Sequence, residues 1–178
     1  MGSALQRPMP LYKDMEAPVI SGCPKNEAMN TDPGKPFVVV SWTNPTATDN
    51  SEVPSEVYCN PASGTNFAIG LTNVTCVATD GDSNIATCSF SVFVEDVQAP
   101  EIDPCPGHQN EVLLPGENTT TVFWPVPNAT DNSGITPSVK CNPPPGSLFP
   151  LGLTPIVCTA IDGSGNIASC NLHVYVQG

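Results

Sequence analysis

The stretch that decides the fold is written twice in the chain, as VTCVATDGDSNIATCSFSVFV at residues 74–94 and as IVCTAIDGSGNIASCNLHVYV at residues 156–176. In each copy, apolar and polar residues alternate on both sides of a segment rich in Asp, Gly, Ser and Asn. A period of two predicts half-buried strands, and the central residues tolerate the backbone angles of a tight turn. Each copy is therefore predicted to form a β-hairpin.

One face of each hairpin is predicted to point into a core. The inward rows are Cys88, Phe90, Val92 and Val94 in the first copy, with Val74, Cys76 and Ala78 from the preceding strand, and Cys170, Leu172, Val174 and Val176 in the second. Upstream, Val40 with Trp42 and Val122 with Trp124 mark a further inward row. We assign both tryptophans to the core rather than to a ligand-stacking platform, because large aromatic side chains in an inward row are usually buried.

The cysteines extend the repeat over the whole chain. They stand at positions 23, 59, 76 and 88, and again, 82 residues later in every case, at positions 105, 141, 158 and 170. The same offset relates residues 48–51 to residues 130–133. The chain is thus one module written twice. We expect the modules to span residues 17–96 and 97–178, and residues 1–16 to hold a cloning-derived start and the end of a preceding module.

An even number of cysteines in a small module predicts disulfides and an oxidising, extracellular compartment. No C-x-x-C pair occurs, and the chain has only two histidines, so structural zinc is not expected. Sequons at Asn73, Asn118 and Asn128 predict N-glycosylation and point to the same compartment. No apolar run is long enough to predict insertion into a membrane.

The net charge of −12 is spread along the chain. Residues 17–98 carry two basic and nine acidic residues, and residues 99–178 carry one basic and six. An acidic surface argues against nucleic acid as a partner and against anionic membrane surfaces. It is compatible with calcium, with basic partners, or with solubility alone.

The fold class predicted from these patterns is all-β. Twenty-one prolines and fourteen glycines divide the chain into short segments, and no long stretch has helical periodicity. About six or seven short strands per module fit an immunoglobulin-like sandwich of two sheets.

The order of motifs resembles the hyalin repeat, or HYR domain. Module one has Cys23-Pro24, then V-S-W-T-N-P at 40–45, A-T-D-N-S at 47–51, F-A-I-G-L-T at 67–72 and A-T-D-G at 78–81. Module two has the matching Cys105-Pro106, V-F-W-P-V-P at 122–127, A-T-D-N-S at 129–133, F-P-L-G-L-T at 149–154 and A-I-D-G at 160–163. Module two departs from the family pattern at Leu172, where Phe is commoner.

The resemblance implies two tandem immunoglobulin- or fibronectin-III-like sandwiches in a matrix or cell-surface protein. It implies a structural, adhesive role without catalysis, with other extracellular proteins or further copies of the module as partners. The alternative is a calcium-dependent or glycan-binding receptor fragment. A catalytic triad would need His108 or His173, and neither is repeated in the other module.

Four cysteines allow three pairings in each module. The sandwich implied by the resemblance favours Cys23–Cys88 with Cys59–Cys76, and Cys105–Cys170 with Cys141–Cys158, because the first strand runs beside the last and the Cys59 strand beside the Cys76 strand. Pairing of Cys76 with Cys88 across the hairpin remains the rival.

Calcium is the one cofactor that the sequence raises. Asp49 and Asp131, each followed by Asn, place hard oxygen ligands in a loop, and Asp96 places another at the junction. Asp14, Glu16 and Gln98 add further oxygens at corresponding positions. The competing interpretation is that these residues cap local turns.

Overall fold

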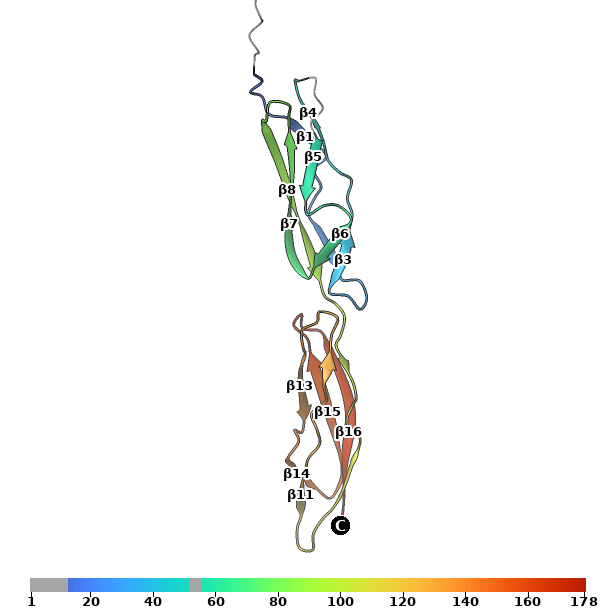
Figure 1. Ribbon diagram of the computed structural model, residues 1–178. Coiled ribbons are helices and arrows are strands. Elements are labelled where there is room, and N and C mark those ends of the chain that lie inside the picture. The colour runs from blue at the N-terminus through green and yellow to red at the C-terminus, as the bar shows by residue number, and fades with distance from the viewer. Residues whose placement is uncertain (1–12, 52–55) are drawn as a thin grey trace, which may run out of the picture. The chain divides into compact units, whose positions relative to one another are not determined.

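The computed structural model describes residues 13–51 and 56–178, and within these ranges all regular structure is β-strand. The strands form two sets of sheets, one set for each copy of the repeat, and no sheet combines strands of both copies (Figure 1). Within the same ranges, nothing forms a helix of the length and apolarity that crossing a membrane requires.

Module one contains eight strands in its described residues: β1 (Val19–Ser21), β2 (Glu27–Asn30), β3 (Phe37–Val40), β4 (Thr46–Thr48), β5 (Glu56–Asn60), β6 (Thr65–Ala68), β7 (Gly70–Thr79) and β8 (Ile85–Glu95). Module two contains the matching eight: β9 (Glu101–Ile102), β10 (Gln109–Val112), β11 (Thr119–Val122), β12 (Ala129–Thr130), β13 (Ser138–Asn142), β14 (Ser147–Pro150), β15 (Gly152–Ile161) and β16 (Ile167–Gln177). The sequence predicted six or seven, and strands of two or three residues such as β9 and β12 are too short to leave an alternation.

Each module is a sandwich built around a four-stranded sheet, in the order β2-β8-β7-β5 or β10-β16-β15-β13. Short pairs, β3 with β6 and β11 with β14, supply strands for the facing layer. The predicted hairpin is present: β15 and β16 pair antiparallel from Gly152 opposite Val176 to Ile161 opposite Ile167. Strand β10 lies parallel to β16, so the first long strand of the module runs beside the last.

The core consists of the predicted inward rows. Phe90, Val92 and Val94 are buried in β8, as are their counterparts in β16, Leu172, Val174 and Val176. Trp124 is 5% exposed and packs at a tilt against Phe149, with ring centroids 5.9 Å apart. Trp42 is half-buried and meets the ring of Phe90 edge-on at 5.0 Å. Both tryptophans thus pack on core aromatic residues, as edge-to-face and tilted ring pairs do in protein interiors.

Each module holds two disulfides, which are Cys23–Cys88 and Cys59–Cys76 in module one and Cys105–Cys170 and Cys141–Cys158 in module two. This is the pairing that the strand-neighbour argument favours. Cys141 lies directly opposite Cys158 in the register of β13 and β15, while Cys170 lies opposite Cys158 on the other side. Cys158 therefore has two cysteine neighbours across the sheet and is bonded to the one on β13.

Removing either type of cross-link is expected to destabilise its module. On the chain-entropy model, the loop of 65 residues closed by Cys105–Cys170 is worth about 4 kcal/mol and the loop of 17 residues closed by Cys141–Cys158 about 3 kcal/mol. Urea unfolding of the paired substitutions Cys105→Ala/Cys170→Ala and Cys141→Ala/Cys158→Ala measures these losses. A variant that unfolds at the same urea concentration as the parent chain contradicts the prediction.

Candidate cation site

Three aspartates come together in each module. In module one they are Asp14, Asp49 and Asp80, and one carboxylate oxygen of each lies within 4.8 Å of the other two. In module two Asp96, Asp131 and Asp162 form the same group with the same spacing. The two groups are related by the 82-residue offset, so the cluster is a property of the module.

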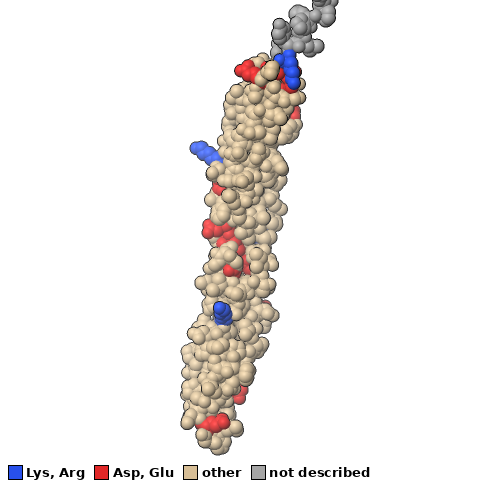
Figure 2. All heavy atoms as spheres, turned by 90° about the vertical axis from the view of Figure 1, so that its left-hand side faces the viewer, with Lys and Arg blue, Asp and Glu red and all other residues tan. Residues whose placement is uncertain are grey.

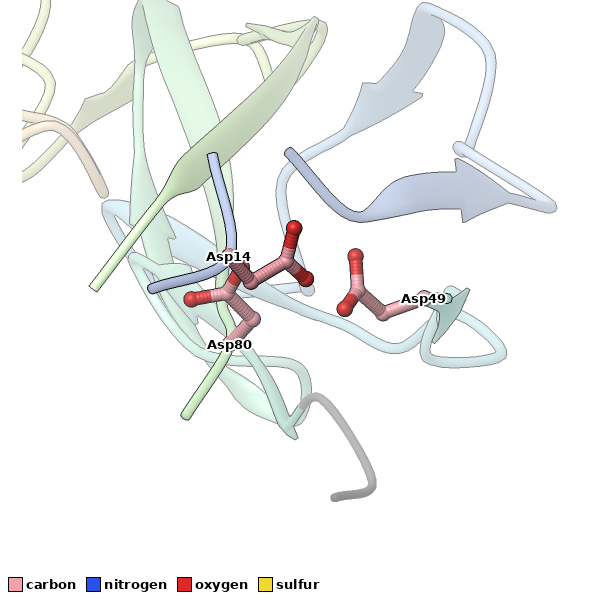
Figure 3. A group of neighbouring side chains, drawn as sticks. All are labelled: Asp14, Asp49 and Asp80. Atoms are coloured by element: carbon pink, nitrogen blue, oxygen red, sulfur yellow. The ribbon is translucent and has the colours of Figure 1, made fainter. Parts of the chain in front are cut away.

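Each aspartate directly follows a strand or precedes the first one. Asp49 follows β4, Asp80 follows β7, and Asp14 lies on the segment that leads into β1. Strands β1 and β4 pair antiparallel, with Val19 opposite Thr48, and this pairing brings the entering segment beside the loop after β4. Figure 3 shows the three carboxylates coming from three separate segments of the chain. In module two, β9 pairs with β12 in the same way.

Every aspartate of the cluster uses one oxygen to close its own turn. In module two, Oδ1 of Asp96, Asp131 and Asp162 accepts the main-chain N–H of the residue two positions later, at 3.1, 2.9 and 2.8 Å. In module one, Asp14, Asp49 and Asp80 accept corresponding bonds at 3.0, 2.9 and 2.9 Å. Turn capping, the competing interpretation of these residues, is therefore correct for one oxygen of each carboxylate.

The second oxygen is what turn capping leaves unexplained. In module two, Oδ2 of Asp96 and Oδ2 of Asp131 are buried and have no hydrogen-bond partner, and the Asp96 side chain as a whole is only 3% exposed. In module one, Asp14 Oδ2 and Asp49 Oδ1 are in the same condition. A buried acceptor without a donor costs about 1–3 kcal/mol and more when it is charged. Such atoms call for a ligand that the protein itself does not supply.

An asparagine ties each cluster together. Asn166 Nδ2 donates to Asp162 Oδ2 at 2.8 Å and to the main-chain oxygen of Asp96 at 3.0 Å. Asn84 does the same in module one, to Asp80 Oδ2 at 2.7 Å and to the oxygen of Asp14 at 3.1 Å. One amide group thus holds the entering segment against the hairpin turn, which fixes the distance between two of the three carboxylates.

The hydrogen bonds keep these carboxylates ionised. Burial raises the pKa of Asp162, but the bonds that Asn166 donates from its side chain and main chain, with those from the main chain of the turn, outweigh burial and lower the net pKa. The pKa of Asp80 is lowered in the same way against the same opposing effect of burial, with Asn84 as the principal donor. At Asp14, the main-chain N–H of Glu16 is the largest cause of a lowered pKa. The carboxylates of Asp14, Asp80 and Asp162 therefore remain ionised at neutral pH.

The donor set selects a class of ion. The cluster offers carboxylate oxygens, the cysteines are all in disulfides, and neither histidine belongs to it. Hard oxygen ligands suit calcium or magnesium and not zinc. Several carboxylates from separate turns favour calcium, which accepts six to eight oxygens in variable geometry, over magnesium, which demands an octahedron and keeps its water.

The structure places the sequence-predicted ligands in two groups. Asp49 lies in the first cluster, and Asp96 and Asp131 lie together in the second. Asp80 and Asp162 are the members that sequence reasoning missed, because it assigned them to the hairpin turn alone. The signal that could have found them is their position at the end of a fully buried strand row, where Ala78 and Ala160 are 0% exposed. The sequence indicates Asp14 only as a further oxygen at the entering segment.

The other predicted modification sites lie on the surface. Asn73, Asn118 and Asn128 are exposed, as glycan attachment requires, and their glycosylation stays a prediction. The two histidines stack on each other with ring centroids 3.6 Å apart, and His173 donates its main-chain N–H to His108 Nδ1 at 3.2 Å.

On the face shown in Figure 2, basic side chains stand singly and acidic side chains form several small separate groups.

Comparison with known proteins gives the same repeat. The family model of the HYR domain matches twice, at residues 13–94 and 95–176, which places Asp14 and Asp96 inside the modules rather than before them. These boundaries differ by two to four residues from those expected from the sequence.

Curated proteins with related sequences are several times longer than this chain. It is 36% identical over 168 residues to rat "Sushi, von Willebrand factor type A, EGF and pentraxin domain-containing protein 1", covering 93% of this chain and 5% of that protein. It is 37% identical over 150 residues to hyalin of Lytechinus variegatus, covering 83% of this chain and 28% of hyalin. Among solved structures, Drosophila N-cadherin EC1-4 aligns over 92% of this chain and 50% of its own, with 12% identity and a TM-score of 0.42.

The Asn166 side chain is expected to be a principal stabiliser of its cluster. Substituting Asn166→Ala removes two hydrogen bonds, one of them to a buried carboxylate, and should lower the free energy of unfolding by about 1.5–3 kcal/mol. Chemical denaturation in the presence of a chelator measures the loss. Ser164→Ala is the control, because Ser164 contributes its main-chain N–H, which alanine retains. Equal stability of the two variants would contradict the role assigned to Asn166.

Proposed function

The chain belongs to the HYR domain family, and from this premise we propose that it is a non-enzymatic extracellular module pair that acts in adhesion and binds calcium at the aspartate cluster of each module. Its partners on this proposal are other extracellular proteins or further copies of the same module. The observation that carries the calcium assignment is the pair of buried, unpartnered carboxylate oxygens that recurs in both modules. The activity of a whole protein that contains such modules is part of the same proposal, since this chain spans 5% and 28% of two relatives.

Several features support an extracellular location. All eight cysteines are in disulfides, which persist in oxidising compartments and are rare in the cytosol. Three sequons are exposed. The aspartates of each cluster bring three carboxylates together in an arrangement that could hold a metal ion, so the clusters fit ion binding better than chemistry.

A bound calcium ion would supply positive charge at the point where three carboxylates face one another. Asp14, Asp49 and Asp80 would contribute oxygens from three different segments, and Asp96, Asp131 and Asp162 would do so in module two. In each module, the ion therefore links the entering segment, the loop after the short strand pair and the hairpin turn. Because the folded state alone assembles these ligands, binding stabilises the fold.

Calcium is expected to raise the melting temperature of the chain. At an ion concentration tenfold above the dissociation constant, one site adds about 1.4 kcal/mol to the free energy of unfolding. Thermal unfolding in chelator and in a calcium series up to several millimolar, the range typical of extracellular modules, measures the rise. Asp49→Asn/Asp131→Asn should abolish it, because each asparagine keeps an oxygen for its turn while the cluster loses one charge.

Glu111→Gln is the matched control for this experiment. It removes one negative charge from β10, opposite Val176 near the far end of β16 from Asp162, and leaves both clusters intact. The control should show the same calcium-dependent rise as the parent chain. A melting temperature that is independent of calcium in the parent chain, with no heat in titration calorimetry, disposes of calcium binding.

Adhesion is expected to depend on the same residues. Cells or matrix-coated surfaces should attach to the immobilised tandem in calcium, and attachment should fall several-fold in chelator or on the Asp49→Asn/Asp131→Asn variant, because the proposal makes the calcium-loaded fold the adhesive form. Counting attached cells on surfaces of equal protein density is the measurement. Calcium-dependent binding to a glycan array, without attachment to protein surfaces, would favour the receptor-fragment alternative instead.

A further inference from the structure

The two clusters share their three ligands but differ in the charges that adjoin them. Position 16 is Glu in module one, and its counterpart, position 98, is Gln in module two. Position 82 is Asp in module one, and its counterpart, position 164, is Ser. Module one therefore adds two carboxylates beside its cluster at places where module two has neutral side chains.

Glu16 reaches the first cluster through Asn50. The Asn50 amide donates from one nitrogen to Glu16 Oε2 at 3.0 Å and to Asp14 Oδ1 at 3.2 Å. The two carboxylates therefore lie on either side of a single Nδ2 group. In module two the corresponding amide, Asn132, donates to Asp96 Oδ1 at 3.1 Å, and the residue at the Glu16 position carries no charge.

Asp82 adjoins the first cluster from the hairpin turn. Its Oδ2 accepts the main-chain N–H of Asp14 at 3.0 Å, so a fifth carboxylate is held against the segment that carries a ligand. Ser164 occupies this position in the turn of module two and brings no charge. Module one thus has two further carboxylates, Glu16 and Asp82, hydrogen-bonded next to its three ligands, and module two has only neutral side chains at these two positions.

We propose that the two modules load with calcium in sequence, module one binding the ion at least about tenfold more tightly than module two, by virtue of Glu16 and Asp82. This rests on the proposed function, in which both clusters bind calcium. One further unit charge about 6 Å from a divalent ion is worth on the order of tenfold in the binding constant in water before salt screening. Two such charges leave roughly tenfold after screening at moderate salt.

Two other differences between the modules oppose or complicate this effect. Lys13 and Glu95, which precede Asp14 and Asp96, oppose this charge difference. Both are exposed, as Glu16 is, but Glu16 is held beside Asp14 through the Asn50 amide, whereas Glu95 faces outward between the buried Val94 and Asp96. Solvent and salt screen such charges. The deeper burial of Asp96 strengthens its attraction for the ion and also makes removal of water from the ion more costly, and these two consequences offset each other.

The test measures calcium binding in chains in which only one of the two clusters keeps all its aspartates. Titration calorimetry on the Asp131→Asn chain reports module one, and on the Asp49→Asn chain it reports module two. At low ionic strength the dissociation constant of the first is expected to be at least about tenfold lower, and the ratio should shrink as salt is raised. Equal constants in the two chains would overturn the inference while leaving calcium binding in place.

Exchanging the two differing positions decides whether they are the cause. Adding Glu16→Gln/Asp82→Ser to the Asp131→Asn chain should weaken binding to the level of module two. Adding Gln98→Glu/Ser164→Asp to the Asp49→Asn chain should tighten it about tenfold. Each exchanged residue already occurs in the sister module, so the fold accommodates it, and far-ultraviolet circular dichroism verifies this.

Glu95→Gln in the Asp49→Asn chain is the control, because it removes a charge that lies near the cluster but is not part of it. This substitution should change the dissociation constant for calcium by less than about twofold. Exchange variants that leave both constants unchanged overturn the inference. Absence of calcium binding in the parent chain is a separate result, because it removes the proposed calcium function itself.

Discussion

The pairing of β15 with β16, and of β7 with β8, is the constraint on which the rest of each module depends. These are the longest strands, and their inward side chains form a continuous wall of the core, from Ile156 and Cys158 to Val174 and Val176. Both disulfides of a module are anchored on this hairpin, through Cys158 and Cys170 in module two. Its turn carries Asp162, so the same element that builds the core also sets one corner of the cluster.

The cluster shows how one residue type can serve two purposes. Each aspartate of module two accepts the main-chain N–H of its own turn with one oxygen, and its carboxylate also lies within 4.8 Å of the other two. The first task is local and fixes the orientation of the side chain, and the second depends on that orientation. In the absence of a cation, the facing charges work against folding, and the hydrogen bonds of Asn84 and Asn166 work for it. These asparagine bonds thus hold the entering segment against the hairpin turn although three carboxylates face one another there.

The sequence predicted those features that local pattern controls. Alternation located the inward rows, including Val92 and Val174, because it is a property of neighbouring residues, and the constant offset of 82 residues between the cysteines located the repeat. Convergence of Asp14 with Asp49 and Asp80 was not predictable, since it follows from the two- and three-residue strands that bring distant segments together. Asp80 also has a sufficient local explanation as a turn residue, and that explanation concealed its second role. Asp49, Asp96 and Asp131 were predicted as ligands because they place hard oxygen atoms in a loop and at the junction, although the same residues also suit turn capping.

The parallel placement of β10 beside β16 determines how a module responds to tension. In a module whose Cys105–Cys170 bond is reduced, a pull on the chain before β10 and after β16 loads these neighbouring strands in opposite directions along their length, so their hydrogen bonds are sheared together rather than opened one by one. The intact disulfide between Cys105 and Cys170 removes this load from β10, because force that enters near residue 105 passes through the disulfide directly to residue 170. Residues 106–169, with the hairpin turn and two of the three aspartates, lie outside the line of load. The extension of a stretched module is therefore limited to the residues that lie outside the loop closed by this disulfide.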